Sequence, residues 1–257
     1  MEQLISIVIP VYNAASYLPD TIRSVEKQTY TDWELICVDD ASTDESLSLL
    51  YDCKKRWEQE GKQNKIKIFS LSKNQGPAVA RNTGIRAAKG RYLAFLDADD
   101  IWDAKKLEKQ YQFLTKHDYA FTFTGYEFAD KTAKRNGKVV HVPYQIKYEE
   151  ALKNTTISTI TVLFDRSKIP DNLLFMPEDC AREDTATWWK ILRNGYTAYG
   201  LDEALSVYRR HKASHSSNKW HGVKGTWNMY RRQEGFSILK SARYMSVNLL
   251  RAVKRRL

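Results

Sequence analysis

Apolar residues in the first hundred positions form short continuous runs that alternate with segments of helical character. The apolar runs are rich in β-branched side chains and lie at residues 4–11, 33–39, 66–71 and 91–97. Runs that are apolar throughout are typical of strands buried on both faces of a parallel sheet. The segments between them are predicted as helices, at 15–28, from Ser42 or Asp44 to about Glu60, and at 77–88. This alternation predicts an α/β sheet with right-handed crossovers.

The pattern changes after residue 100, where helices and strands no longer alternate regularly. We predict helices at 104–117 and 183–194 and strands at 119–130 and 155–164. A hairpin is expected around Asn136-Gly137, because this dipeptide favours a tight turn. The chain from about residue 225 is predicted to be helical.

The composition fits a soluble globular protein and excludes several other classes. Apolar residues make up 42% and charged residues 28% of the 257 positions, which rules out a collagen, a coiled coil or a disordered chain. No run of 18 apolar residues occurs, so no transmembrane helix is predicted. Three cysteines without a close pair, and an N-terminus that lacks a basic region, predict a protein of the cytoplasm.

The basic residues gather at one end of the chain. Thirteen of the 41 Lys and Arg residues lie in 208–257, where Glu234 is the one acid, and the rest of the chain is close to neutral. A basic end predicts a phosphate-rich partner, such as an anionic membrane or a phosphorylated substrate. No nucleic-acid partner is expected, because the sequence has neither a helix-turn-helix pattern nor interleaved aromatic and basic strands.

Three carboxylates follow the fourth predicted strand directly. Asp97, Asp99 and Asp100 lie where this strand ends, and ligands of α/β sheets bind at the carboxyl ends of strands. Unpaired acids at such a place repel one another, and Mg²⁺ or Mn²⁺ would neutralise them. The alternative is a polar turn in which the acids cap a helix.

Other strand ends carry polar residues as well. Asp40 follows the second strand, Pro10 and Tyr12 end the first, and the segment from Asn74 to Arg81 opens a helix after the third. A helix N-terminus with an Arg suits a diphosphate. Capping alone explains Asp44 well, but explains Asp40 less well.

Together these segments resemble family 2 glycosyltransferases. Four motifs occur in order: S-I-V-I-P-V-Y-N at 6–13, V-D-D-A-S-T-D at 38–44, N-Q-G-P-A-V-A-R-N at 74–82 and L-D-A-D-D at 96–100. R-E-D at 182–184, followed by W-W-K-I-L, is similar to the family's later acidic segment, and Y-R-R-H at 208–211 to its substrate loop. The phrases F-T-F-T-G-Y-E and T-A-Y-G-L are similar to the bacterial branch typified by teichuronic-acid biosynthesis enzymes.

The resemblance implies the GT-A fold, a Rossmann-like mixed sheet flanked by helices. A GT-A domain would span 1–224, with a nucleotide-binding half at 1–102 and an acceptor-binding half at 103–224, followed by a basic helical tail at 225–257. The implied enzyme is an inverting, metal-dependent glycosyltransferase. It would move a sugar from a UDP-sugar to a cell-surface glycan, with the acceptor linked to a polyprenyl diphosphate.

The resemblance also implies roles for single residues. Pro10, Tyr12 and Asp40 would surround the uracil, Asn74 and Arg81 would hold the nucleotide, and Asp97 would meet the ribose or the metal. Asp99 would bind Mn²⁺ or Mg²⁺, and His211 is a further metal candidate. Asp184 would be the general base, and acceptor or phosphate contacts would come from Glu183, Trp188 and Arg209.

Alternatives remain at three points. Asp179 is a second candidate base, in a Glu-Asp pair that lacks the helical continuation. The tail from residue 237 has apolar residues on one face and basic residues between them; the apolar ones are Leu239, Ala242, Met245, Leu249 and Val253. This helix is predicted to lie on the anionic inner face of the cell membrane. Packing of this helix on the body, or in a homodimer, is the other interpretation. For the whole chain, the alternative is a non-catalytic protein that binds nucleotide-sugars or polyanions.

Overall fold

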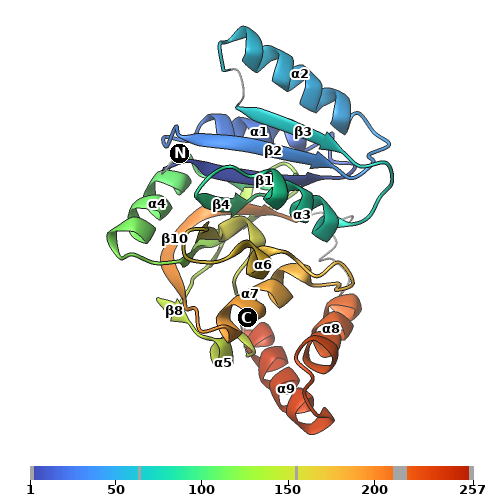
Figure 1. Cartoon of the computed structure of the whole chain (residues 1–257). Helices are drawn as coiled ribbons and strands as arrows, with labels where there is room; N and C mark the ends of the chain where they lie inside the picture. Colours follow the sequence, from blue (N-terminus) through green and yellow to red (C-terminus); the bar gives the residue numbers. More distant parts are fainter. Residues whose placement is uncertain (1–2, 63–64, 154–155, 211–218, 255–257) are drawn as a thin grey trace.

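One mixed sheet forms the centre of the molecule (Figure 1). The computed structural model describes residues 3–62, 65–153, 156–210 and 219–254. The strands follow the order β3-β2-β1-β4-β9-β6-β10-β5, with β7 paired to β6 and β8 paired to β10. Their bounds are β1 Ile5–Val11, β2 Trp33–Asp39, β3 Ile66–Ser70, β4 Tyr92–Phe95, β5 Ile101–Trp102, β6 Phe121–Ala129, β7 Arg135–Val140, β8 Gln145–Ile146, β9 Leu163–Asp165 and β10 Ala198–Arg209. The four strands predicted from the first hundred residues are confirmed.

The strand directions bring distant segments to one edge of the sheet. β1 pairs in parallel with β2 and β4, and β2 pairs in parallel with β3. β9 runs antiparallel to both β4 and β6, and β10 runs parallel to β6. Two reversals return β6 and β10 to the direction of β4. The carboxyl ends of β1, β2, β4, β6 and β10 therefore share one edge, which we call the carboxyl edge.

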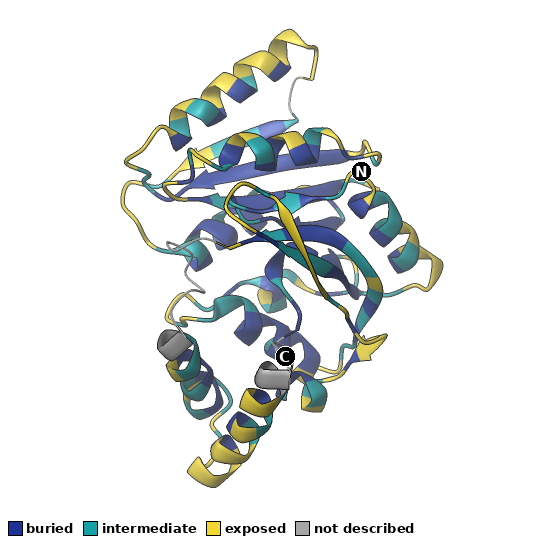
Figure 2. Ribbon diagram, turned by 180° about the vertical axis from the view of Figure 1, so that it is seen from behind, coloured by how far each residue is buried: buried dark blue, intermediate teal, exposed yellow. Residues whose placement is uncertain are grey.

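Helices cover both faces of the sheet. α1 (Leu18–Glu26), α2 (Ser46–Gln59) and α4 (Lys106–Lys116) enclose one apolar core. α3 (Pro77–Ala87), α6 (Asp171–Leu174) and α7 (Glu183–Arg193) enclose the other. The strands β1, β2, β4 and β9 are almost entirely buried, whereas the outer sides of the helices are exposed (Figure 2). The predicted helices 104–117 and 183–194 are thus confirmed.

The C-terminal residues form two helices that pack beside α7 and α5 (Tyr148–Ala151). α8 (Lys219–Asn228) continues into a π-helical turn, η3 (Met229–Gln233), and α9 (Ile238–Lys254) follows after Gly235, whose φ is +64°. The buried Tyr230 ring stacks on Trp189 with ring centroids 5.1 Å apart, and Tyr244 donates a hydrogen bond of 2.6 Å to Glu149 Oε2. The predicted helical tail is therefore interrupted, and its inner side is part of the folded body.

Two predicted elements are wrong. The hairpin turn does not lie at Asn136-Gly137, which belong to β7; it lies at residues 130–134. Asp130 Oδ1 accepts hydrogen bonds from the N–H groups of Thr132 at 2.8 Å and Lys134 at 3.1 Å, and this side chain fixes the turn there.

The strand predicted at 155–164 is mostly absent. Residues 154–155 lie outside the described residues, Thr159–Thr161 form a 3₁₀ turn, and β9 covers only Leu163–Asp165. The backbone carbonyls of this turn are bound by side chains instead of a neighbouring strand. Trp102 Nε1 donates to the carbonyl of Ile160 at 2.8 Å, and Gln110 Nε2 to that of Thr161 at 2.8 Å. β10, which no pattern predicted, pairs with β6 on the side opposite to β9.

Gly84 allows α3 to lie directly against β1. A Cβ at this position would lie 2.3 Å from Val8 Cγ1, and the β-branched Val8 cannot easily move away. We expect Gly84→Ala to lower the free energy of unfolding by about 1–3 kcal/mol through overpacking. Gly222 in α8 is a matched control, because a Cβ placed there has no heavy atom of the described residues within 4 Å beyond its chain neighbours and the adjoining backbone of its own helix. Gly222→Ala should be neutral or stabilise by up to about 1 kcal/mol in urea unfolding. Equal losses in both variants would contradict the close packing of α3.

Candidate active site

The loops after β1 and β2 are tied together at the carboxyl edge. Asn13 adopts φ +48°, and its Oδ1 accepts a hydrogen bond of 2.8 Å from the Thr43 N–H. The Asn13 N–H in turn donates to Ser42 Oγ at 3.0 Å. These two hydrogen bonds fix the backbone beside Tyr12. This residue is 47% exposed, so its ring is available for stacking on a ligand. Pro10 ends the same strand and is half-buried.

Asp40 connects the end of β2 to the start of α3. Its carboxylate is buried and accepts hydrogen bonds from the backbone N–H groups of Gln75 at 2.8 Å and Gly76 at 2.7 Å. Burial raises the pKa of this carboxyl, and the two N–H bonds partly oppose the shift. Asp40 thus holds the loop that carries the exposed Asn74. Each carboxylate oxygen has a second lone pair that a ligand N–H could use.

Arg81 joins two acidic segments at the carboxyl edge. Its Nη2 lies 2.6 Å from Asp97 Oδ1, and its Nη1 lies 2.6 Å from Glu183 Oε1. Asp97 follows β4 and Glu183 begins α7, so the contact bridges the halves predicted to bind nucleotide and acceptor. Burial raises the pKa of both carboxyls, while the Arg81 guanidinium acts in the opposite direction.

Asp184 is held by two threonines beside this bridge. Its Oδ2 accepts a hydrogen bond of 2.9 Å from the Thr159 hydroxyl, and its Oδ1 accepts one of 2.6 Å from the Thr185 N–H. Its charge acts on Asp97, Arg81 and Glu183. The structure therefore brings together the predicted base and the Asp97 segment. Asp179 is exposed, without a comparable set of bonds among the described contacts.

Asp97 and Asp99 have the chemistry of one half of a metal site. Both are half-buried, and the neighbouring charge of Asp99 contributes to the raised pKa of Asp97. Within the described ranges, no three His, Cys, Asp or Glu side chains could hold a metal by themselves. Mg²⁺ and Mn²⁺ sites often combine one or two carboxylates with substrate phosphates and water, so this pair fits such an ion when a diphosphate is present.

Asp100 and Arg209 play structural roles at the same edge. Buried Asp100 accepts a hydrogen bond of 2.8 Å from the Arg209 N–H, and burial together with Asp99 raises its pKa well above the usual range. The Arg209 guanidinium is itself buried, pairs with Asp20 Oδ2 at 3.1 Å and lies over the Tyr17 ring. The Arg209 side chain is thus bound within the protein. It does not make the predicted contact with an acceptor or a phosphate.

Trp188 belongs to the core. Its buried ring packs against Phe95, Phe121 and Phe164, with ring centroids 5.2–6.4 Å apart. The predicted acceptor contact is wrong for this residue, because the inner face of α7 turns it towards the sheet. His211 lies outside the described residues.

Two site residues were missed by the sequence analysis. Thr159 binds Asp184 from 25 positions away, and Asp20 binds Arg209 from 189 positions away. No motif marks either residue, because each lies in a different segment from its partner.

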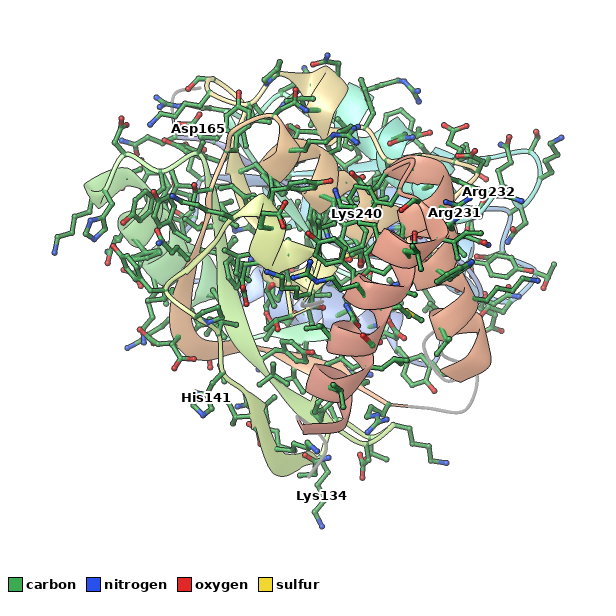
Figure 3. The ribbon with its side chains drawn as sticks, turned by 90° about the horizontal axis from the view of Figure 1, so that it is seen from below. Lys134, His141, Asp165, Arg231, Arg232 and Lys240 are labelled. Carbon is green, nitrogen blue, oxygen red and sulfur yellow. The ribbon has the colours of Figure 1, made fainter. Side chains whose placement is uncertain are left out.

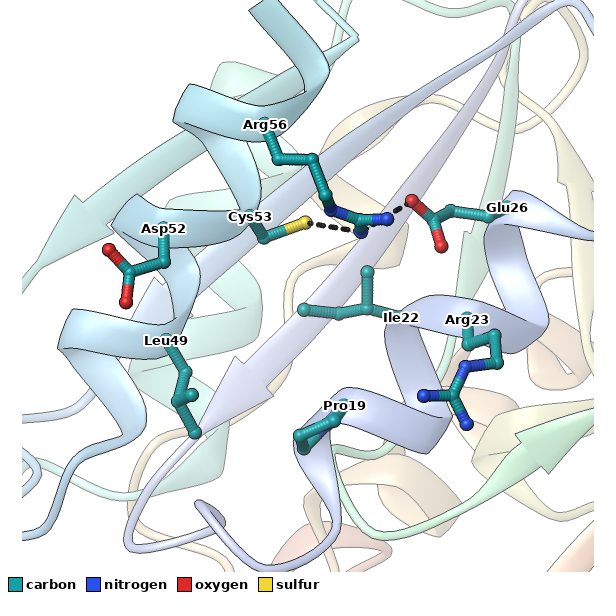
Figure 4. Close-up of a pocket in the computed structure, with 8 residues that line it drawn as sticks. All are labelled: Pro19, Ile22, Arg23, Glu26, Leu49, Asp52, Cys53 and Arg56. Carbon is teal, nitrogen blue, oxygen red and sulfur yellow. Dashed lines mark hydrogen bonds and ion pairs between the residues drawn. The ribbon is translucent and has the colours of Figure 1, made fainter. Parts of the chain in front are cut away.

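A groove between α1 and α2 lies apart from these acids (Figure 4). Its volume is about 280 Å³, and it is lined by Pro19, Ile22, Arg23, Glu26, Leu49, Asp52, Cys53 and Arg56. Arg56 crosses it, between Cys53 Sγ and Glu26 Oε1. Apart from His211, which lies outside the described residues, the predicted site residues do not line this groove.

The fold and the acids at its carboxyl edge define a class. A mixed α/β sheet of this order, with helices on both faces and an Asp-x-Asp segment after β4, is the GT-A fold of glycosyltransferases. Solved structures with this fold include the following two. S. aureus TarS 1–349 in complex with UDP-GlcNAc matches 97% of this chain and 72% of that chain at a TM-score of 0.74 and 20% identity. The mannosyltransferase PcManGT from Pyrobaculum calidifontis, in complex with GDP-Man and Mn²⁺, matches 95% and 70% at a TM-score of 0.72 and 19% identity.

The chain belongs to glycosyl transferase family 2, whose model matches residues 6–169. It is 41% identical to the putative teichuronic acid biosynthesis glycosyltransferase TuaG of Bacillus subtilis, over 100% of this chain and 98% of that protein. It is 36% identical to the UDP-Glc:alpha-D-GlcNAc-diphosphoundecaprenol beta-1,3-glucosyltransferase WfgD of Escherichia coli, over 89% and 85% of the two chains. The protein is a glycosyltransferase, and the predicted family and fold are confirmed. The alternative of a non-catalytic binding protein is thereby excluded.

Proposed function

We propose that the protein transfers a sugar from a UDP-sugar to a lipid-linked cell-surface glycan, with inversion at the anomeric carbon. The observation that carries this proposal is the position of Asp184 beside the Arg81 bridge to Asp97, which places a candidate base next to a candidate diphosphate site. The names of relatives support the substrates: WfgD is a UDP-glucose enzyme that acts on a diphosphoundecaprenol-linked sugar.

The donor end of the site is the edge of β1, β2 and β4. The exposed Tyr12 ring can stack on the uracil, and Asp40 can accept from the ring N–H through a free lone pair. Asp99 and Asp97 would hold Mn²⁺ or Mg²⁺, which when bound would neutralise the leaving diphosphate. PcManGT, with GDP-Man and Mn²⁺, supports metal use in this fold.

The transfer step needs a base on the acceptor side. Asp184 takes the proton of the acceptor hydroxyl while that oxygen forms a bond to the anomeric carbon. The bond from this carbon to the diphosphate oxygen breaks on the opposite face, and UDP leaves with the electron pair. Thr159 and Thr185 hold the Asp184 carboxylate in one orientation for this step.

A screen of nucleotide-sugars tests the proposed reaction. Release of the nucleoside diphosphate (UDP, GDP or ADP) is measured for each donor, with and without Mn²⁺, in the presence of a diphosphate-linked GlcNAc acceptor on a short prenyl chain. Transfer from one UDP-sugar with an inverted product supports the proposal. Turnover of only GDP- or ADP-sugars, or retention of configuration, would refute it.

We also propose that α9 docks the enzyme on the inner face of the cell membrane. No helix within the described residues is long and apolar enough to cross a membrane. Leu239 is 84% and Leu250 71% exposed on the outer side of α9, whereas Met245 is 8% exposed and faces the body. Of the apolar face predicted from the sequence, Leu239 and Leu249 are exposed whereas Met245 is buried, so this face is divided between the surface and the body.

Basic residues accompany this exposed apolar side. Lys240 and the neighbouring Arg231 and Arg232 lie at the same C-terminal end of the molecule (Figure 3), and Arg243 is exposed on α9. An apolar stripe with basic residues suits an anionic bilayer. The side chains of the four basic residues from 251 to 256 are outside the described residues, but their charge adds to the same segment.

Substitutions on the outer side of α9 test the membrane contact. Lys240→Gln with Arg243→Gln should weaken binding to anionic vesicles about tenfold or more, since each basic residue near such a surface contributes about 1 kcal/mol. Leu239→Ser with Leu250→Ser should weaken it further. Tyr51→Ser, an exposed apolar residue of α2, is the control. Co-sedimentation with phosphatidylcholine vesicles, with and without phosphatidylglycerol, measures the effect. Unchanged sedimentation, or a dimer that the Leu variants dissociate, would contradict membrane docking.

A further inference from the structure

Arg81 sits between the donor side and the base side of the site without room for a ligand of its own. Its side chain is 7% exposed, and its two terminal nitrogens are bound to different acids, Asp97 and Glu183, each at 2.6 Å. These acids are 16 and 102 positions away in the sequence. A guanidinium usually binds one carboxylate through both nitrogens, so this divided arrangement is a bridge.

The burial of Arg81 argues against the nucleotide contact that the family resemblance implies for this residue. Its Nε is buried and has no hydrogen-bond partner within the part of the chain that the structure describes, and its Nη1 also faces Met176 Sδ at 4.0 Å. A diphosphate would have to displace one of the two acids to reach the guanidinium. Meanwhile the negative charges of Asp97, Asp184 and Glu183 all act on this one cation. The guanidinium of Arg81 is therefore bound to acids of the protein.

We propose that Arg81 is a positioning residue that fixes the base segment, Glu183-Asp184, at a set distance from the donor segment at Asp97. The inference rests on the proposed role of Asp184 as base. Glu183 is the first residue of α7 and Asp184 the second, so a displacement of Glu183 moves the carboxylate of Asp184 with it. A shift of about 1 Å in a reacting group can lower a rate about 10²-fold, whereas binding of the donor depends on the other side of the bridge.

Two single variants and their combination test the bridge. Arg81→Lys keeps the charge, but one ammonium group cannot span both carboxylates. Glu183→Gln keeps the shape and removes the ionic contact. We expect each to lower kcat by about 10–10²-fold, with UDP affinity by calorimetry changed by only about threefold or less. In the double variant the two losses should not multiply, because both remove the same contact. Arg86→Lys, on the same helix but over the Phe175 ring, is the matched control.

The outcomes separate positioning from other roles. If Arg81 instead binds the donor, Arg81→Lys should raise the dissociation constant for UDP, and the effect of Glu183→Gln should be independent of it. If the contact between Arg81 and Glu183 only stabilises the fold, the variants should have a lower melting temperature but a wild-type kcat per UDP-binding site. If Arg81→Lys does not fold, a wild-type kcat in Glu183→Gln overturns the proposal by itself. Failure of the base assignment is read separately, because it would appear as wild-type turnover of Asp184→Asn in the same assay.

Discussion

Asp184→Asn is expected to lower the rate of sugar transfer by about 10²–10⁴-fold, the usual loss when a general base is removed. The asparagine amide keeps the size of the side chain. Its oxygen can still accept from the Thr185 N–H and its NH2 can donate to the Thr159 hydroxyl, so α7 should remain in place. UDP affinity should stay nearly unchanged, because the proposed uracil contacts come from the loops after β1 and β2. Steady-state rates and calorimetric titration with UDP measure the two effects.

Asp179→Asn is the control for this result. Asp179 is an exposed acid five positions earlier, and its loss should leave the rate near that of the wild type. The reverse pattern, with turnover lost in Asp179→Asn and kept in Asp184→Asn, would move the base to the earlier Glu-Asp pair. Loss of turnover together with loss of UDP binding would instead indicate that Asp184 supports the nucleotide site.

Asp99→Ala is expected to abolish the gain in UDP affinity that Mn²⁺ or Mg²⁺ provides. The carboxylates and the diphosphate repel each other unless a cation lies between them, so the intact protein should bind UDP more tightly with metal than with EDTA. Replacement of residues that merely support a metal ligand costs about 10–100-fold in metal affinity, and loss of a ligand should cost at least as much.

Asp52→Ala provides the matched control for the metal experiment. It removes one carboxylate from the exposed side of α2, beside the groove and away from the carboxyl edge. UDP is titrated into both variants with metal and with EDTA. Equal UDP affinity in metal and EDTA for the wild type would show that the Asp97-Ala98-Asp99 segment is not a metal site. A metal effect that survives in Asp99→Ala would assign the ion to other residues.

Much of the donor half was predictable from the sequence. The apolar runs of β1, β2 and β4 are buried on both faces, and continuous burial leaves a continuous apolar pattern in the sequence. Strands of one direction end at one edge, so Tyr12, Asp40 and Asp97 could be expected to meet there. The motifs around them then indicated the family. These features are local in the chain, or follow from the rules of parallel sheets.

The local structure of the acceptor half depends on contacts that no local sequence pattern predicts. The 3₁₀ turn at Thr159–Thr161 exists because Trp102 and Gln110 bind its carbonyls, and the hairpin turn exists because Asp130 binds its amides. In both places a side-chain hydrogen bond outweighs the propensity that predicted a strand or a turn elsewhere.

The sequence alone determined the strands of the donor half, the acids at their ends and the family. Only the tertiary structure decided which acids are bound to which cations. Arg81 could equally have faced a nucleotide, Trp188 an acceptor and Arg209 a phosphate, because a motif records the residue type and not its partner. Asp97 and Glu183 reach Arg81 across 16 and 102 positions, and Arg209 reaches Asp20 across 189. Such pairs form when packing of the sheet and α7 excludes water from the charges, and the cost of burying a lone charge then fixes each partner.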